Sequence, residues 1–68
     1  MGMTLSAIER MTPEERATFS KTELRARKDD LAQVHAGAMT LKRAQERAEQ
    51  RRKPWGLTAN QVASLLRK

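Results

Sequence analysis

The chain has 68 residues, of which 38% are hydrophobic, and its formal net charge is +6. This length allows one small domain, residues 1–68, and the absence of cysteine excludes disulfides and cysteine-based zinc sites. His35 is the only histidine, and no apolar run reaches the ~20 residues that a membrane span needs. We therefore expect a protein without metal or cofactor, located in the cytoplasm because no secretory signal is recognisable.

Helix starts are marked by capping boxes, in which Ser, Thr, Asp or Asn is followed three residues later by Glu or Gln. The sequence contains these pairs: Ser6 with Glu9, Thr12 with Glu15, Ser20 with Glu23, Asp30 with Gln33, and Thr58 with Gln61. They predict helical segments over residues 6–10, 13–18, 21–52 and 59–67. No segment combines alternating apolar and polar residues with enrichment in β-branched residues, so we expect an all-α fold without a sheet.

The expected domain divides into three parts. Short helical pieces occupy residues 1–19, a long basic amphipathic helix occupies 20–53, and a turn followed by the C-terminal helix occupies 54–68. Gly37 is the weak point of the long helix, because an interior glycine costs about 1 kcal/mol relative to alanine. No proline, asparagine or second glycine supports a turn there, so a continuous or mildly bent helix is favoured over a hairpin.

Apolar residues recur along the long helix with heptad spacing. The seam consists of Leu24, Leu31, Val34, Ala38, Leu41 and Ala48. Such spacing is typical of helices that pair through one stripe, which predicts a homodimeric helical bundle or short coiled coil. The alternative is a compact monomer in which the N- and C-terminal helices of the same chain cover the stripe.

Positive charge is concentrated in the C-terminal part of the chain. Residues 41–68 hold eight basic and two acidic side chains, which accounts for the whole excess. The candidate binding residues are Lys42, Arg43, Arg47, Arg51, Arg52, Lys53 and the single tryptophan Trp55. A secondary basic track consists of Arg25, Arg27 and Lys28. This asymmetry predicts a polyanion or an acidic protein surface as the partner, and no membrane.

Three of these cations, Arg43, Arg47 and Arg51, recur every four residues and are expected to form one exposed ridge. Trp55 follows Pro54, where the helix must stop. We expect Trp55 to pack into the corner that turns the last helix back, rather than to serve as a stacking platform.

The segment from Lys42 to Gly56 broadly resembles arginine-rich RNA-binding helices, such as those of lambdoid phage antitermination N proteins. Those helices also mix arginine with alanine, glutamine and glutamate near a tryptophan. The resemblance implies an RNA partner and a tryptophan that can stack on an RNA loop. This chain departs from the pattern because its cations are sparser and Pro54 separates Trp55 from the helix.

Two functions follow as hypotheses, and neither is enzymatic, because the chain has one histidine, no cysteine and no glycine-rich phosphate loop. The first is a small nucleic-acid-binding regulator of the phage or plasmid type, which contacts DNA or RNA phosphates through the helix from Lys42 to Lys53. The alternative is a helical adaptor or inhibitor that binds a host protein. Its exposed apolar positions would be Met39, Leu41 and Leu65.

Overall fold

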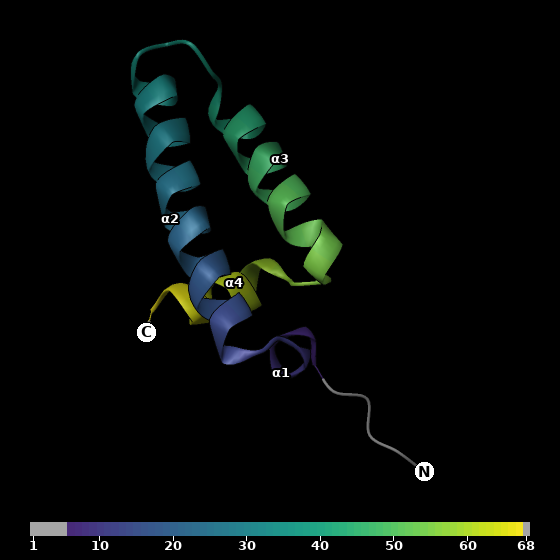
Figure 1. Ribbon diagram of the computed structural model, residues 1–68. Helices are drawn as coiled ribbons and strands as arrows, with labels where there is room; N and C mark the ends of the chain where they lie inside the picture. Colours follow the sequence, from purple (N-terminus) through teal and green to yellow (C-terminus); the bar gives the residue numbers. More distant parts are fainter. Residues whose placement is uncertain (1–5, 68) are drawn as a thin grey trace.

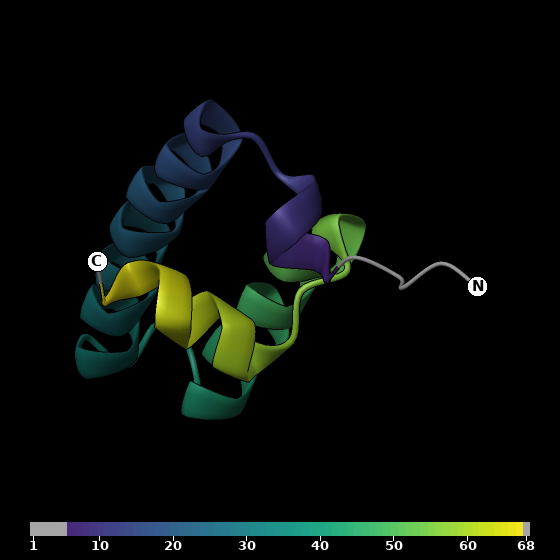
Figure 2. The ribbon, with the colours of Figure 1, turned by 90° about the horizontal axis from the view of Figure 1, so that it is seen from below.

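The computed structural model describes residues 6–67, which fold into four α-helices and one short 3-10 helix and contain no strand. The elements are α1 (Ala7–Arg10), α2 (Pro13–His35), α3 (Leu41–Arg52), η1 (Lys53–Trp55) and α4 (Ala59–Leu66). This confirms the all-α class. Helices α2 and α3 run side by side as an antiparallel hairpin, and α1 and α4 lie at its open end (Figure 1). Seen from below, α4 crosses between the two long helices, both of which it contacts (Figure 2).

Three of the five predicted capping boxes are present, and they begin α1, α2 and α4. At α2 the Thr12 hydroxyl accepts from the Glu15 amide at 3.1 Å, and the Glu15 carboxylate accepts from the Thr12 amide at 2.8 Å. The boxes predicted at Ser20 and Asp30 are wrong, because both residues lie inside α2. A helix that begins at Pro13 meets no glycine or proline before Gly37, so the separate piece over 13–18 does not exist.

The predicted continuous helix over 21–52 is also wrong, because the chain reverses at Gly37. Gly37 has a φ of 77°, and the amide of Ala38 donates to the Gln33 carbonyl at 2.9 Å. The Gly37 amide donates to the Val34 carbonyl at 3.1 Å, which completes a Schellman motif at the end of α2. Thr40 then caps α3 by accepting from the Arg43 amide at 3.1 Å. This cap was not predicted because no Glu or Gln follows Thr40 at the third position.

Replacing Gly37 with alanine should lower the free energy of unfolding by about 1 to 2 kcal/mol, the cost of left-handed backbone for an L-residue. An added Cβ would meet no atom within 4 Å, so the effect is one of backbone conformation alone. Urea unfolding followed by circular dichroism measures it. Gly37→Asn is the matched control. Its free energy of unfolding should fall by less than that of the alanine variant, because asparagine tolerates the left-handed conformation. Equal stability of the alanine variant and the wild type would contradict the left-handed turn.

The hydrophobic core lies at the open end of the hairpin. Its buried residues come from α1, α2, the last turn and α4: Ala7, Met11, Phe19, Leu57, Val62 and Leu65. Arg16 fastens α1 to this core, since its guanidinium donates to the carbonyls of Ile8 and Met11 at 3.1 and 2.8 Å. Leu65 is buried, so its predicted place on an exposed docking surface is wrong.

Candidate functional site

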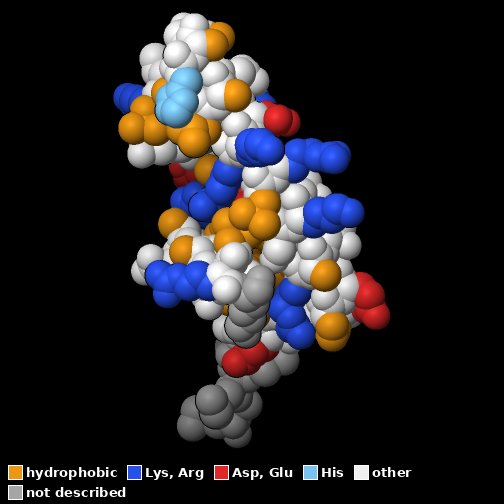
Figure 3. Space-filling view, turned by 90° about the vertical axis from the view of Figure 1, so that its left-hand side faces the viewer, with side chains coloured by type: hydrophobic (Ala, Val, Ile, Leu, Met, Phe, Trp, Pro, Cys, Tyr) orange, Lys and Arg blue, Asp and Glu red, His pale blue; other side chains and the backbone are white. Residues whose placement is uncertain are grey.

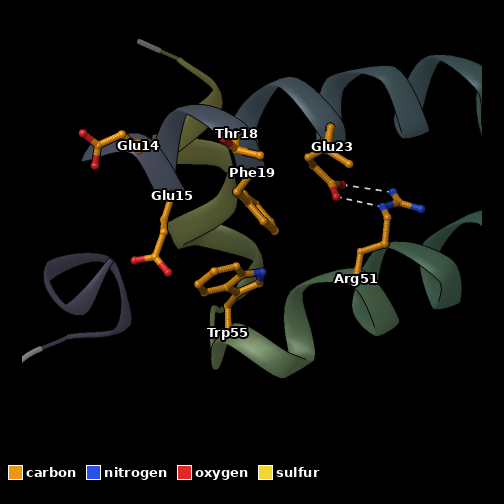
Figure 4. Close-up of a pocket in the computed structure, with 8 residues that line it drawn as sticks. Glu14, Glu15, Thr18, Phe19, Glu23, Arg51 and Trp55 are labelled. Atoms are coloured by element: carbon orange, nitrogen blue, oxygen red, sulfur yellow. Dashed lines mark hydrogen bonds and ion pairs between the residues drawn. The ribbon is translucent and has the colours of Figure 1, made fainter. Parts of the chain in front are cut away.

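An ionic cluster joins the two helices of the hairpin. Glu23 and Asp30 lie seven residues apart on one face of α2, and they are only 2% and 4% exposed. Arg51 of α3 reaches both carboxylates: its Nε and Nη2 donate to Glu23 at 2.8 and 3.0 Å, and its Nη1 donates to Asp30 at 3.0 Å. Figure 4 shows this arginine facing Glu23 across the hairpin. The two bonds to Glu23 are the paired geometry in which guanidinium–carboxylate contacts are strongest.

Two further arginines complete the cluster. Arg47 Nε donates to Asp30 Oδ1 at 3.1 Å, and Arg27 Nε donates to Glu23 Oε2 at 2.8 Å. No buried side-chain nitrogen or oxygen among residues 6–67 lacks a hydrogen-bond partner. The cluster therefore joins two buried carboxylates to three guanidinium groups within the hairpin.

Ionisation of the cluster is set by competition between burial and the arginines. Burial alone would raise the pKa of Glu23, but the hydrogen bonds from Arg51 and Arg27 outweigh it and lower that pKa. Burial would also raise the pKa of Asp30. The hydrogen bonds and positive charges of Arg51 and Arg47 outweigh this effect, so the pKa of Asp30 is lowered as well. The hydrogen bond to Glu23 raises the pKa of Arg51. Glu23, Asp30 and Arg51 are consequently charged at neutral pH.

This cluster changes the surface that the sequence predicted. Arg47 and Arg51 turn toward α2, and the Arg51 side chain is only 22% exposed. Arg43 and Arg47 of the predicted ridge are both exposed, but only Arg43 makes no ion pair with any residue in 6–67. Sequence reasoning missed the partners, because Glu23 and Asp30 are recognisable as such only once the chain is known to reverse.

The remaining cations of the candidate site are Lys42, Arg52 and Lys53, none of which forms an ion pair within the described part of the chain. Lys42 and Lys53 are exposed on α3 and η1, where Glu46 and Glu49 lie between them in sequence and are exposed as well. The outer surface of α3 thus carries both signs of charge. In the secondary track, Arg27 forms an ion pair with Glu23. The other two residues, Arg25 and Lys28, are exposed.

An open groove of about 750 Å³ lies between α2 and α3. Its apolar lining comes from both helices and from the first residue of α4: Leu31, Val34, Leu41, Ala44, Ala48 and Ala59. Leu31 and Leu41 are 50% and 59% exposed, so two large apolar side chains face solvent here. Figure 3 shows hydrophobic side chains gathered beside the only histidine, near the turn of the hairpin, with lysine and arginine side chains below them.

Four of the six predicted seam positions line this groove, and the other two, Leu24 and Ala38, do not. The seam is not a continuous helical stripe, because the reversal at Gly37 places Leu41 and Ala48 across from Leu31 instead of beyond it. Leu24 is 52% exposed on α2. The chain itself therefore leaves the stripe half open, although Ala59 of α4 lines part of the groove.

Trp55 lies at the corner between α3 and α4, where its ring packs edge-on against Phe19. The two ring centroids are 6.4 Å apart and the ring planes meet at 76°. Gly56, with a φ of 70°, follows the tryptophan and lets the chain turn toward α4. More than a third of the Trp55 surface, 38%, stays exposed.

No protein-family model, curated protein or solved structure matches this chain. None of the described helices is long and apolar enough to span a membrane. Among residues 6–67, no three histidine or carboxylate side chains come together in a way that could hold a metal ion.

Proposed function

We propose that the chain is a helical adaptor, and that the groove between α2 and α3 receives an amphipathic helix of a partner protein. The observation that carries the proposal is the half-exposure of Leu31 and Leu41 on facing helices. Exposed apolar surface inside a groove characterises interaction sites. A third helix laid along two antiparallel helices would bury both leucines, as in helix-in-groove recognition.

The charges around the groove favour an acidic partner and orient it. The net charge of +6 attracts an acidic segment at long range and speeds its encounter. At the rim, Lys42 and Arg52 lie beside Glu46 and Glu49, so contacts of both signs are available. Complementary charges at a rim act mainly on specificity and association rate, while the apolar centre supplies affinity.

Nucleic-acid binding is the second candidate function, and a specific observation favours it. Lys42, Arg43 and Lys53 are exposed and free of ion pairs within residues 6–67, so they can reach phosphate oxygens. Arg47 and Arg51 would have to leave buried carboxylates to do the same. This candidate therefore relies on fewer cations than the charge count alone suggests.

Replacing Leu31 with glutamine should reduce capture of the partner from nuclease-treated lysate about tenfold or more. Burying a leucine contributes about 1.5 to 3 kcal/mol, and a tenfold change is about 1.4 kcal/mol. Leu24→Gln is the matched control, since Leu24 lies on the same helix, is 52% exposed and does not line the groove. Quantitative mass spectrometry of the captured material compares the two variants.

The same experiment separates the other possibilities. If nuclease treatment removes all capture by the wild-type protein, the nucleic-acid candidate replaces the adaptor. If sedimentation velocity shows a wild-type dimer and a Leu31→Gln monomer, the occupant of the groove is a second copy of the chain, as the heptad spacing predicted. Equal capture by the Leu31 and Leu24 variants would refute a role for the groove.

A further inference from the structure

A second cavity, of about 420 Å³, lies at the open end of the hairpin (Figure 4). The first turns of α2 form one wall and Trp55 forms the other, with Phe19 between them. Both aromatic residues of the chain line this cavity. It shares only Arg51 with the lining of the groove, so the two hollows are separate surfaces.

The cavity is acidic although the protein is basic. Its lining includes three carboxylates, those of Glu14, Glu15 and Glu23, and one guanidinium, that of Arg51. Glu23 is already neutralised by Arg51 and Arg27. Glu14 is exposed and forms no ion pair within residues 6–67, and Figure 4 shows the Glu15 carboxylate extending toward the side on which Trp55 lies.

Helix capping accounts for part of this arrangement. Acidic residues are favoured in the first turn of a helix, and the Glu15 carboxylate accepts from the Thr12 amide at 2.8 Å. Capping does not require an aromatic wall opposite the carboxylates. It also does not require that Trp55 keep 38% of its surface exposed in a chain with so few large apolar side chains.

The combination selects a cation that carries an aliphatic stem. A cation over the face of an indole gains attraction from the ring quadrupole, and tryptophan is the strongest aromatic partner. Carboxylates at the mouth add charge complementarity, and the volume falls within the range of ligand pockets, about 300 to 1,000 Å³. A nucleotide base stacked on the same ring would place its phosphate near Glu14 and Glu15, which repel it.

We propose that this cavity binds a lysine or arginine side chain of a partner protein. The aliphatic stem lies against Phe19 and Trp55, and the charged head lies between the indole and the carboxylate of Glu15. Glu14, whose carboxylate points away from Trp55 in Figure 4, adds negative charge at the edge of the cavity. The site does not rest on the proposed groove function, because it uses different elements and the opposite sign of charge.

Trp55 is the only tryptophan, so its fluorescence reports directly on the cavity. The probes are the blocked amino acids N-acetyl-arginine amide and N-acetyl-lysine amide, titrated at constant ionic strength, with N-acetyl-norleucine amide as a neutral analogue of similar shape. We expect the cationic probes to change Trp55 emission saturably at millimolar concentrations. The norleucine probe should bind with at least tenfold lower affinity. Equal response to the neutral probe, or no saturation by the cations, would overturn the proposal.

The double variant Glu14→Gln/Glu15→Gln removes both carboxylate charges of the cavity lining that form no ion pair within residues 6–67. It should lower the affinity for the cationic probes at least fivefold. It should still fold, since glutamine can cap a helix as Gln61 does for Thr58 in this chain. Glu46→Gln/Glu49→Gln is the control with the same change in net charge, on α3 and outside the cavity lining. An equal loss of probe affinity in both double variants would show a general effect of net charge and would refute the proposal.

Discussion

Replacing Arg51 with methionine should lower the free energy of unfolding by about 3 kcal/mol, the largest single-residue effect that we expect. Removing one partner of a buried ion pair typically costs about 3 to 5 kcal/mol, because a charge stays buried without compensation. Glu23 and Asp30 keep Arg27 and Arg47 as partners, which places the loss near the lower limit. A domain of this size has about 3 to 10 kcal/mol of stability in total, so a substantial fraction of the variant should be unfolded.

Urea unfolding followed by far-UV circular dichroism measures the loss. Arg52→Met is the matched control: Arg52 is the neighbouring, partly buried arginine and forms no ion pair within residues 6–67. Its effect should stay within about 0.5 kcal/mol. Adding Glu23→Gln to the Arg51 variant should recover part of the lost stability, because it removes a buried charge that Arg27 alone would have to balance. If Arg51→Met and Arg52→Met unfold at the same urea concentration, the cluster does not hold the hairpin together.

Acidification should destabilise the protein through the same cluster. The pKa values of Glu23 and Asp30 are lowered in the folded chain, so the unfolded chain binds protons first as the pH falls. Their contribution is complete above the unfolded pKa values, near pH 4, and is lost as the pH drops through the lower folded values. The free energy of unfolding should be level above about pH 5 and decline steadily below about pH 4.

The double variant Glu23→Gln/Asp30→Asn isolates this contribution. It should be less stable than the wild type at neutral pH, because the arginines then face neutral amides. The difference in stability should narrow as the pH falls toward 3, since acid neutralises the same carboxylates in the wild type. Glu46→Gln/Glu49→Gln, which alters two exposed carboxylates of α3, should show little narrowing. A wild-type advantage that is constant from pH 7 to pH 3 would contradict ionised cluster carboxylates.

The ionic cluster also fixes the geometry on which both proposed binding surfaces depend. Arg51 lines the groove and the aromatic cavity, and it sets the separation of α2 and α3 at the point where the two hollows approach each other. Binding assays on variants of this arginine would therefore mix unfolding with loss of a surface. The matched pairs of variants for each surface leave the five residues of the cluster unchanged.

Local patterns in the sequence correctly predicted the features that depend on a few neighbouring residues. Ser6, Thr12 and Thr58 begin helices because their hydroxyls meet an amide three residues away, whatever the rest of the chain does. Ser20 belongs to the same pattern and begins no helix. Its capping bond would have required α2 to be interrupted, and no glycine or proline interrupts it before Gly37.

The role of each arginine could not be predicted locally. Arg43, Arg47 and Arg51 are equivalent by spacing, and all three were expected to face a partner. Contacts with Glu23 and Asp30, which lie 17 to 28 residues earlier in the chain, turn two of them inward. Exposure of the groove has a similar origin, since the apolar spacing identified the stripe but not the reversal that opens it.

The sequence by itself determined the all-helical class, the starts of three helices and the concentration of positive charge near the C-terminus, because these depend on composition and short-range hydrogen bonds. Only the tertiary structure decided between a bent helix and a hairpin. A glycine inside a helix costs about 1 kcal/mol relative to alanine, and a glycine can also end a helix without strain. The local preference of Gly37 for a turn over a continuous helix is therefore small. The interactions that settle the choice join residues of α2 to residues of α3, and they exist only after the chain has reversed.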